Sequence, residues 1–148
     1  IIAFDSKKTD LIEWSYFNKN LLIPHQISSL GFAENILEGT LNKKINKSGA
    51  GKLNGYREIL NLINDTKIDA VIIFGEANEI FESKDLKALL EAAIQNNIII
   101  AANRTTADFV LHSSLIDTEY SIHKTEKKLI ERSEVLGSSK TFPLAKAS

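Results

Sequence analysis

Short apolar runs alternate with amphipathic segments along most of this chain. Ala70–Phe74 and Ile98–Ala102 are runs of five apolar residues without a polar position, which is typical of buried parallel strands. Between them, residues 85–95 place apolar side chains on one face at helical spacing, and Ser83 precedes the segment as a candidate cap. The pattern therefore predicts two central strands joined by an amphipathic helix.

The other apolar positions extend this alternation toward both ends of the chain. The pattern predicts three further strands, at Ile1–Phe4, Leu21–Ser28 and Lys43–Lys47, although Pro24 interrupts the second of them. It also predicts further helices at residues 6–18, 31–37 (closed by Gly39), 56–63 and 105–112. A flexible loop is predicted at Ser48–Gly51.

Strands that alternate with helices of this length favour a parallel sheet covered by helices on both faces. We therefore expect an α/β fold with three layers, α/β/α, around a five-stranded parallel sheet. This domain would span residues 1–114. Residues 115–148 are mostly charged and small polar, and we interpret them as a C-terminal tail, partly helical or extended. We expect the tail to become ordered only by docking on its own core, a neighbouring subunit or another protein, with Phe142-Pro143-Leu144 as its apolar anchor. The alternative is a frayed chain end.

Composition and charge exclude several classes of function. Of the 148 residues, 18 are Lys or Arg and 19 are Asp or Glu, so no overall field favours nucleic acid. The longest apolar runs fall far below the ~20 residues that span a bilayer. Cysteine is absent, which suits a reducing compartment, and we expect a cytoplasmic protein without a cofactor. Because methionine is also absent and the chain begins on strand-like Ile1-Ile2, we expect the native start to lie upstream.

Two segments carry candidate anion chemistry. Asp5-Ser6-Lys7-Lys8 follows the first strand, where free backbone N–H groups and a lysine could hold a phosphate, although Asp5 or Ser6 could simply cap the helix. The loop Ser48–Lys52 is glycine-rich, but Leu53 follows its lysine where a P-loop needs Ser or Thr. It is therefore either an anion-binding turn or a plain connection.

Acidic residues follow the predicted central strand. Glu76, Glu79, Glu82 and Asp85 could supply a base or a metal ligand, or could form a solvated loop leading into a helix. We favour the loop, because no patterned partner accompanies these carboxylates. The three histidines show no metal-ligand spacing, and we expect no metal site; they are His25, His112 and His123.

Several short motifs occur in order and together resemble methylglyoxal synthase over Ile1 to about Ser114. They are Ile1-Ile2-Ala3-Phe4-Asp5, Lys67-Ile68-Asp69, Asp85-Leu86-Lys87-Ala88-Leu89-Leu90, Asn97–Asn103 and Thr106-Ala107-Asp108-Phe109. The resemblance implies a five-stranded parallel sheet between helices, in agreement with the periodicity. It also implies a homo-oligomer, most often a hexamer, and elimination of phosphate from dihydroxyacetone phosphate, a carbon–oxygen lyase reaction that starts with proton removal by a carboxylate.

The same resemblance exposes departures at the positions that the chemistry needs. Lys8, Asp5 and Asp85 match family residues, whereas Phe4 replaces a histidine. Leu30-Gly31-Phe32-Ala33 replaces a Thr-Gly-Thr-Thr phosphate cradle. Tyr56 takes the position of the family's principal catalytic aspartate, and Glu76 that of another aspartate. Glu82 takes the position of the active-site histidine.

Our leading hypothesis is therefore a catalytically degenerate member that binds, regulates or assembles, with a phosphate-containing molecule or a protein as partner. A weak anion site would involve Lys8, Gly31, Ser48 and Gly49. The alternative is an active lyase on dihydroxyacetone phosphate or a related sugar phosphate, in which Asp5, Glu76 or Asp85 serves as the base. A third hypothesis is a nucleotide- or effector-binding domain, by analogy with a related domain of carbamoyl phosphate synthetase. Phe32 and Tyr56 could then stack on the ligand, although both could equally be core residues.

Overall fold

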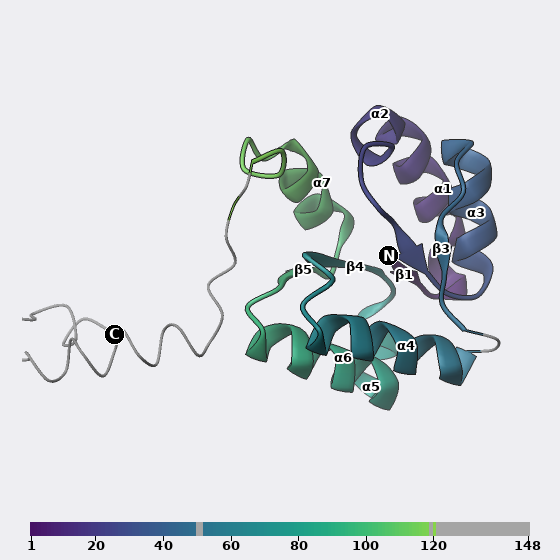
Figure 1. The fold of residues 1–148 in the computed structure, drawn as a ribbon. Helices are drawn as coiled ribbons and strands as arrows, with labels where there is room; N and C mark the ends of the chain where they lie inside the picture. The colour runs from purple at the N-terminus through teal and green to yellow at the C-terminus, as the bar shows by residue number, and fades with distance from the viewer. Residues whose placement is uncertain (50–51, 119, 121–148) are drawn as a thin grey trace, which may run out of the picture.

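The computed structural model describes residues 1–49, 52–118 and 120 (Figure 1). Its strands are β1 (Ile2–Ala3), β2 (Ser28–Ser29), β3 (Asn46–Lys47), β4 (Ala70–Phe74) and β5 (Ile99–Ala101). A 3₁₀ turn at Asp5–Lys7 leads into the first helix. The helices are α1 (Lys8–Phe17), α2 (Lys19–Leu22), α3 (Phe32–Leu41), α4 (Lys52–Asn64), α5 (Ala77–Glu82), α6 (Lys84–Gln95) and α7 (Arg104–His112).

All strand pairs among the described residues are parallel. One sheet has the order β1-β4-β5, and β2 pairs with β3 in a second, two-stranded sheet. The N-terminal ammonium of Ile1 donates to the Ser28 carbonyl at 2.8 Å, and Ser29 Oγ donates to the Ile1 carbonyl at 2.7 Å, so β2 lies beside β1. The predicted α/β class with parallel strands is confirmed, whereas the described strands form a sheet of three and a sheet of two.

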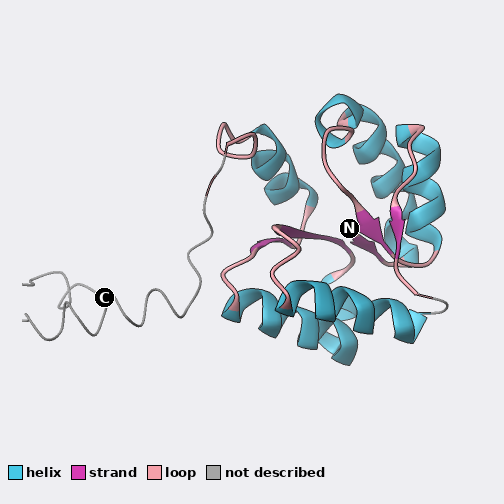
Figure 2. Ribbon diagram, in the orientation of Figure 1, coloured by secondary structure: helices cyan, strands magenta, loops and turns pink. Residues whose placement is uncertain are grey.

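Helices cover both faces of the strands (Figure 2). Helices α4, α5 and α6 lie on one side, and α1, α2, α3 and α7 lie on the other (Figure 1). Strand β4 contributes side chains to two hydrophobic clusters, one on each face of the sheet. Val71 and Ile73 belong to the cluster with α4 and α6, and Ile72 and Phe74 belong to the cluster around Trp14. A side-chain period of two in a strand buried on both faces explains its unbroken apolar run.

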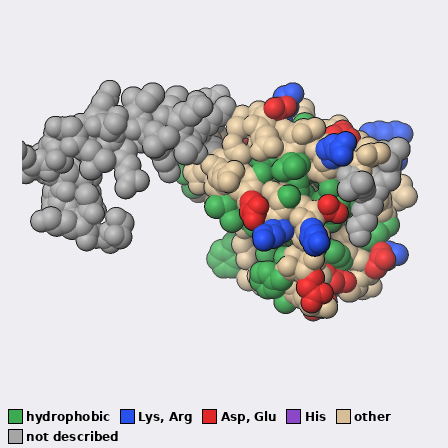
Figure 3. Space-filling view, turned by 90° about the horizontal axis from the view of Figure 1, so that it is seen from below, with side chains coloured by type: hydrophobic (Ala, Val, Ile, Leu, Met, Phe, Trp, Pro, Cys, Tyr) green, Lys and Arg blue, Asp and Glu red, His purple; other side chains and the backbone are tan. Residues whose placement is uncertain are grey.

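The outer face of the α4, α5 and α6 layer mixes hydrophobic with charged side chains (Figure 3). Phe81 of α5 and Ile94 of α6 are among its exposed hydrophobic residues. Scattered apolar residues of this kind are normal on protein surfaces. None of the helices in the described ranges is long and apolar enough to cross a membrane.

The predicted strand at Leu21–Ser28 is wrong. Lys19–Leu22 is instead the short helix α2, and only Ser28–Ser29 pairs as β2. Pro24 has no N–H to donate to a strand ladder, which disfavours pairing across this segment.

Helix α3 continues past the predicted stop at Gly39. It ends before Asn42, which adopts φ 50°. A left-handed residue after the last turn is a common helix terminator.

The acidic segment after β4 is a helix rather than the expected loop. In α5, Glu76 and Glu79 form a capping box, in which each side chain accepts a backbone N–H near the start of the helix. The predicted cap of the first helix is also wrong, because neither Asp5 nor Ser6 makes a capping hydrogen bond. By contrast, Ser83 caps α6 as predicted, accepting from the Leu86 N–H at 3.2 Å.

Two expectations concern the C-terminal part of the chain. The boundary after residue 114 stays a prediction, although the described chain continues through turns to residue 118. The predicted helix or extended structure of the tail and its anchor Phe142-Pro143-Leu144 lie outside the described residues.

Candidate functional site

Polar side chains gather where β1 and β4 end, at the edge where parallel α/β proteins bind ligands. The Phe4 N–H donates to the Phe74 carbonyl at 2.8 Å and holds these two chain ends together. Beyond this bond, Lys7 Nζ lies 2.8 Å from Glu76 Oε1. Ser6 Oγ donates to Glu79 Oε2 at 2.6 Å. The structure thus brings together residues that follow neighbouring strands but lie about seventy positions apart in the sequence.

The charges in this group stabilise one another. Hydrogen bonding to Glu76 first, and to Asp10 second, raises the pKa of the Lys7 ammonium. The Ser6 hydroxyl first, and the Glu76 backbone N–H second, lower the pKa of the Glu79 carboxyl. The arrangement therefore favours the protonated form of Lys7 and the ionised form of Glu79.

Lys8, the predicted phosphate-binding residue, points to a different pair of neighbours. Its ammonium lies 3.6 Å from Asp5 Oδ1 and 4.8 Å from the centroid of the Phe32 ring. A cation at this distance over an aromatic face is attracted by the ring. Phe32 begins α3 directly after Gly31, which adopts φ 64° and ψ −140°. This backbone conformation is open mainly to glycine, so Gly31 allows the turn that brings the ring over Lys8.

Ser48 and Gly49 lie at the end of β3 and are packed against the start of α4. Ser48 is 2% exposed, and its N–H is shared by the Ser29 carbonyl at 3.1 Å and Glu34 Oε1 at 3.2 Å. Gly49 adopts φ 65°, and a Cβ there would lie 2.8 Å from the backbone carbon of Asn54. Gly49 is therefore required for close approach to α4, whatever else this turn does.

Tyr56 and Asp85 form another part of the predicted site. Tyr56 is 5% exposed and belongs to the core cluster between the sheet and α6. Burial is the main reason that the pKa of its hydroxyl is raised, and the Asp85 carboxylate raises it further, while a hydrogen bond with Ser83 acts in the opposite direction. In the described ranges, no hydrogen bond or ion pair connects Asp85 with Asp5 or Glu76.

Sequence reasoning missed the Lys7–Glu76 ion pair and the Ser6–Glu79 hydrogen bond. The available signal was weak, because it consisted only of polar residues at the ends of two predicted strands. Sequence reasoning also missed an open cleft of 610 Å³ between β3 and α4. Within the part of the chain that the structure describes, no group of three His, Cys, Asp or Glu side chains could hold a metal ion.

The fold and this edge define a parallel α/β protein with a polar cluster at the carboxyl ends of its strands. By its sequence similarity, the chain belongs to the methylglyoxal synthase family. It is 35% identical to the methylglyoxal synthase of Coxiella burnetii (strain RSA 493 / Nine Mile phase I) over 121 residues, which are 81% of this chain and 85% of that protein. It is 33% identical to the methylglyoxal synthase of Yersinia enterocolitica over 123 residues, which are 82% and 81% of the two chains.

A solved structure agrees with this assignment. The crystal structure of methylglyoxal synthase from Elizabethkingia anophelis NUHP1 matches with a TM-score of 0.72 and 27% identity, covering 86% of each chain. No family model matches the chain. The similarity to the named relatives nevertheless confirms the predicted family. The names of these relatives agree better with the lyase alternative than with the non-catalytic hypothesis, and none of these names describes a catalytically degenerate protein.

Proposed function

We propose that this chain is a binding or assembly member of the methylglyoxal synthase family with little or no synthase activity of its own. The contact between Lys8 and Phe32 carries the proposal. The Lys8 ammonium lies 4.8 Å from the ring centroid of a partly buried phenylalanine, where the family resemblance implies hydroxyl donors for phosphate. A phenyl ring offers no hydrogen-bond donor to a phosphate oxygen, and it fills space beside the lysine.

Carboxylates of the chain itself support the same proposal. Asp5 lies beside Lys8, Glu76 and Asp10 lie beside Lys7, and Glu34 accepts the Ser48 N–H. A phosphate that used these donors would have to displace a carboxylate or share its donor. Each contact is individually weak at a surface, but together they oppose a second anion.

Tyr56 does not replace the catalytic base of the family. It takes the position where the resemblance places the principal aspartate, and the sequence contains no Asp between Asp10 and Asp65. Burial raises the pKa of its hydroxyl, so the phenol stays neutral at physiological pH and cannot act as a base there. Loss of a positioned base typically removes about 10²–10⁴-fold in rate.

The decisive experiment measures methylglyoxal and inorganic phosphate released from dihydroxyacetone phosphate. The Coxiella burnetii relative serves as a positive control, and Glu76→Gln serves as a matched variant. We expect no release by this chain above the uncatalysed background. Turnover within about a hundredfold of ordinary enzyme values, which are roughly 1–10³ s⁻¹, would contradict the proposal.

A second candidate function is the family lyase reaction, favoured by the names of the relatives and by the Lys7–Glu76 pair. Here Glu76 would remove a proton from the carbon beside the carbonyl, and the resulting enediol would expel phosphate to leave methylglyoxal after tautomerisation. Lys7, 2.8 Å from that carboxylate, would stabilise negative charge on the substrate. This candidate requires that Glu76→Gln abolish a measurable wild-type rate, which the same assay tests.

Self-association is the assembly role that we propose for this chain. Exposed aromatic residues on α1 and α7 support it, because Tyr16, Phe17 and Phe109 are all more than half exposed. Tyr16 and Phe17 also contact each other edge to face, with ring centroids 6.0 Å apart, and apolar side chains that cluster on a surface are typical of interfaces, unlike single scattered ones. Light scattering of the whole chain measures the mass directly, and a concentration-independent monomer would exclude a homo-oligomer, the hexamer included.

A further inference from the structure

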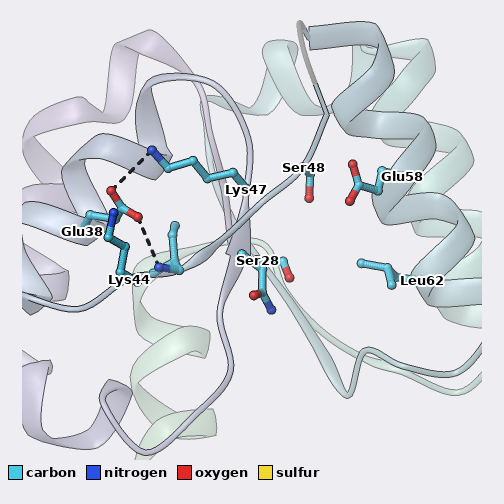
Figure 4. A pocket seen from close by; sticks show the side chains of 9 residues that line it. Ser28, Glu38, Lys44, Lys47, Ser48, Glu58 and Leu62 are labelled. Atoms are coloured by element: carbon cyan, nitrogen blue, oxygen red, sulfur yellow. Dashed lines mark hydrogen bonds and ion pairs between the residues drawn. The ribbon is translucent and has the colours of Figure 1, made fainter.

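The open cleft between β3 and α4 is separate from the Lys7–Glu76 cluster. The cleft has a volume of 610 Å³ and is open to solvent. Figure 4 shows residues of the strand on one wall and Glu58 and Leu62 of α4 on the other. The lining residues are Ser28, Glu38, Lys44, Ile45, Asn46, Lys47, Ser48, Glu58 and Leu62.

Strand β3 lines this cleft, and the edge of β3 that faces away from β2 has no partner strand among the described residues. It pairs only with β2 in the sheets of the described residues. The Asn46 N–H donates to the Ile27 carbonyl at 2.8 Å, and the Ser48 N–H donates to the Ser29 carbonyl at 3.1 Å. Because backbone groups alternate in direction along a strand, the N–H and C=O of Lys47 point away from β2. These are the groups that an additional strand would use.

The two walls of the cleft carry opposite charge. On the strand wall, Glu38 accepts the Ile45 N–H at 3.3 Å and forms an ion pair with Lys47 at 3.4 Å. The backbone hydrogen bond, followed by Lys47 and then Lys44, holds the pKa of Glu38 below its usual range. Two lysines therefore surround one carboxylate on this wall, while the α4 wall carries the carboxylate of Glu58.

We propose that this cleft binds an extended peptide segment that pairs with the outer edge of β3. The peptide backbone would exchange hydrogen bonds with Lys47, and an acidic side chain of the peptide would lie near Lys44 and Lys47. Addition of a strand to an exposed sheet edge is a recurrent mode of peptide recognition, in which main-chain bonds provide affinity and side-chain pockets provide specificity. This proposal goes beyond the proposed function and does not depend on whether the chain catalyses a reaction.

The features of the cleft favour a peptide over a compact polar molecule. A small anion would be held by the lysines alone and would leave the strand edge and the α4 wall unused. An extended chain reaches both walls, because its alternate side chains point to opposite sides. Ile45 and Leu62 supply apolar surface for the side chains between the charged ones. The net positive strand wall then selects an acidic residue at one position of the peptide.

The test uses the whole chain, labelled with ¹⁵N, and the capped peptide Thr-Val-Glu-Val-Thr-Val-Glu as the probe. We expect saturable shifts of the Lys47 and Glu58 amides, slower hydrogen exchange at the Lys47 N–H, and a dissociation constant below about 1 mM. Lys44→Glu should weaken binding about fivefold, which corresponds to the loss of a single partly exposed charge contact. Lys87→Glu, on the exposed face of α6, is the matched control and should leave binding unchanged.

Two control peptides keep the test decisive even if a variant fails to fold. One replaces each Glu by Lys, and the other carries N-methyl groups on alternate residues, which removes strand pairing while keeping the side chains. Equal binding of either control would overturn the proposal, as would the absence of binding up to about 1 mM. Concentration-dependent protection of the Lys47 amide without peptide would assign this edge to a second copy of the chain and would also overturn it.

Discussion

The ammonium of Lys7 lies 2.8 Å from the carboxylate of Glu76 and links the residues that follow β1 and β4. The hydrogen bond with Glu76 raises the pKa of Lys7 from its ordinary value of 10.5. A folded-state pKa above the unfolded one means that the stabilisation is present at neutral pH and is lost as the pH rises through the raised pKa. The pair therefore has a pH signature in the alkaline range.

Replacing Glu76 by Gln should lower the melting temperature slightly at pH 8 and should have little effect above the pKa of Lys7. Thermal unfolding of both proteins at pH 8 and at a pH well above the raised pKa of Lys7 measures this difference. Glu91→Gln is the control, because Glu91 forms only a 3.9 Å contact with exposed Lys87. A Glu76→Gln effect of equal size at both pH values would show that its cause is not the ion pair.

Glu79 predicts the opposite behaviour at acid pH. The Ser6 hydroxyl and the Glu76 N–H hold the pKa of Glu79 below its ordinary value of 4.5. Stability from this group is present above pH 4.5 and is lost as the pH falls through the lowered folded-state pKa. Wild-type protein should therefore lose more stability between pH 6 and pH 3 than Glu79→Gln does. Urea denaturation across this range measures the slope of unfolding free energy against pH for each protein. Parallel slopes would contradict the assignment.

Two glycines should respond in opposite directions to alanine. Gly49→Ala places a Cβ 2.8 Å from backbone atoms at φ 65° and should cost about 1–3 kcal/mol of unfolding free energy. Gly39→Ala meets nothing within 4 Å inside α3 and should stabilise by about 0.5–1 kcal/mol. Chemical denaturation of the two variants under identical conditions measures both values. A neutral Gly49→Ala would mean that this turn tolerates a side chain.

Tyr56 should behave as a core residue. Tyr56→Phe removes its hydrogen bond with Ser83 and should cost about 0.5–1.5 kcal/mol. Tyr56→Asp buries a carboxylate near Asp85 and should destabilise the chain severely without creating synthase activity. Calorimetry and the methylglyoxal assay check these outcomes. A stable Tyr56→Asp variant that produces methylglyoxal would show that this position still faces a working site.

The amino-acid sequence alone determined the α/β class, the family, the central strand and the capped helix α6. The all-apolar run of β4 and the face of α6 carry strong local signals, because burial on both sides of a strand and on one side of a helix imposes distinct periods. The family motifs depend on residue order alone, so they needed no coordinates. Their departures at Phe4, Phe32 and Tyr56 were also visible in the sequence.

Only the tertiary structure decided what surrounds each of those residues. Lys7 and Glu76 meet because parallel pairing places the ends of β1 and β4 side by side, and Phe32 covers Lys8 because the turn at Gly31 directs α3 toward α1. Likewise, α2 replaces a predicted strand and α5 replaces a predicted loop. These features depend on contacts between distant segments, and a local pattern of polar and apolar residues does not encode which segments meet.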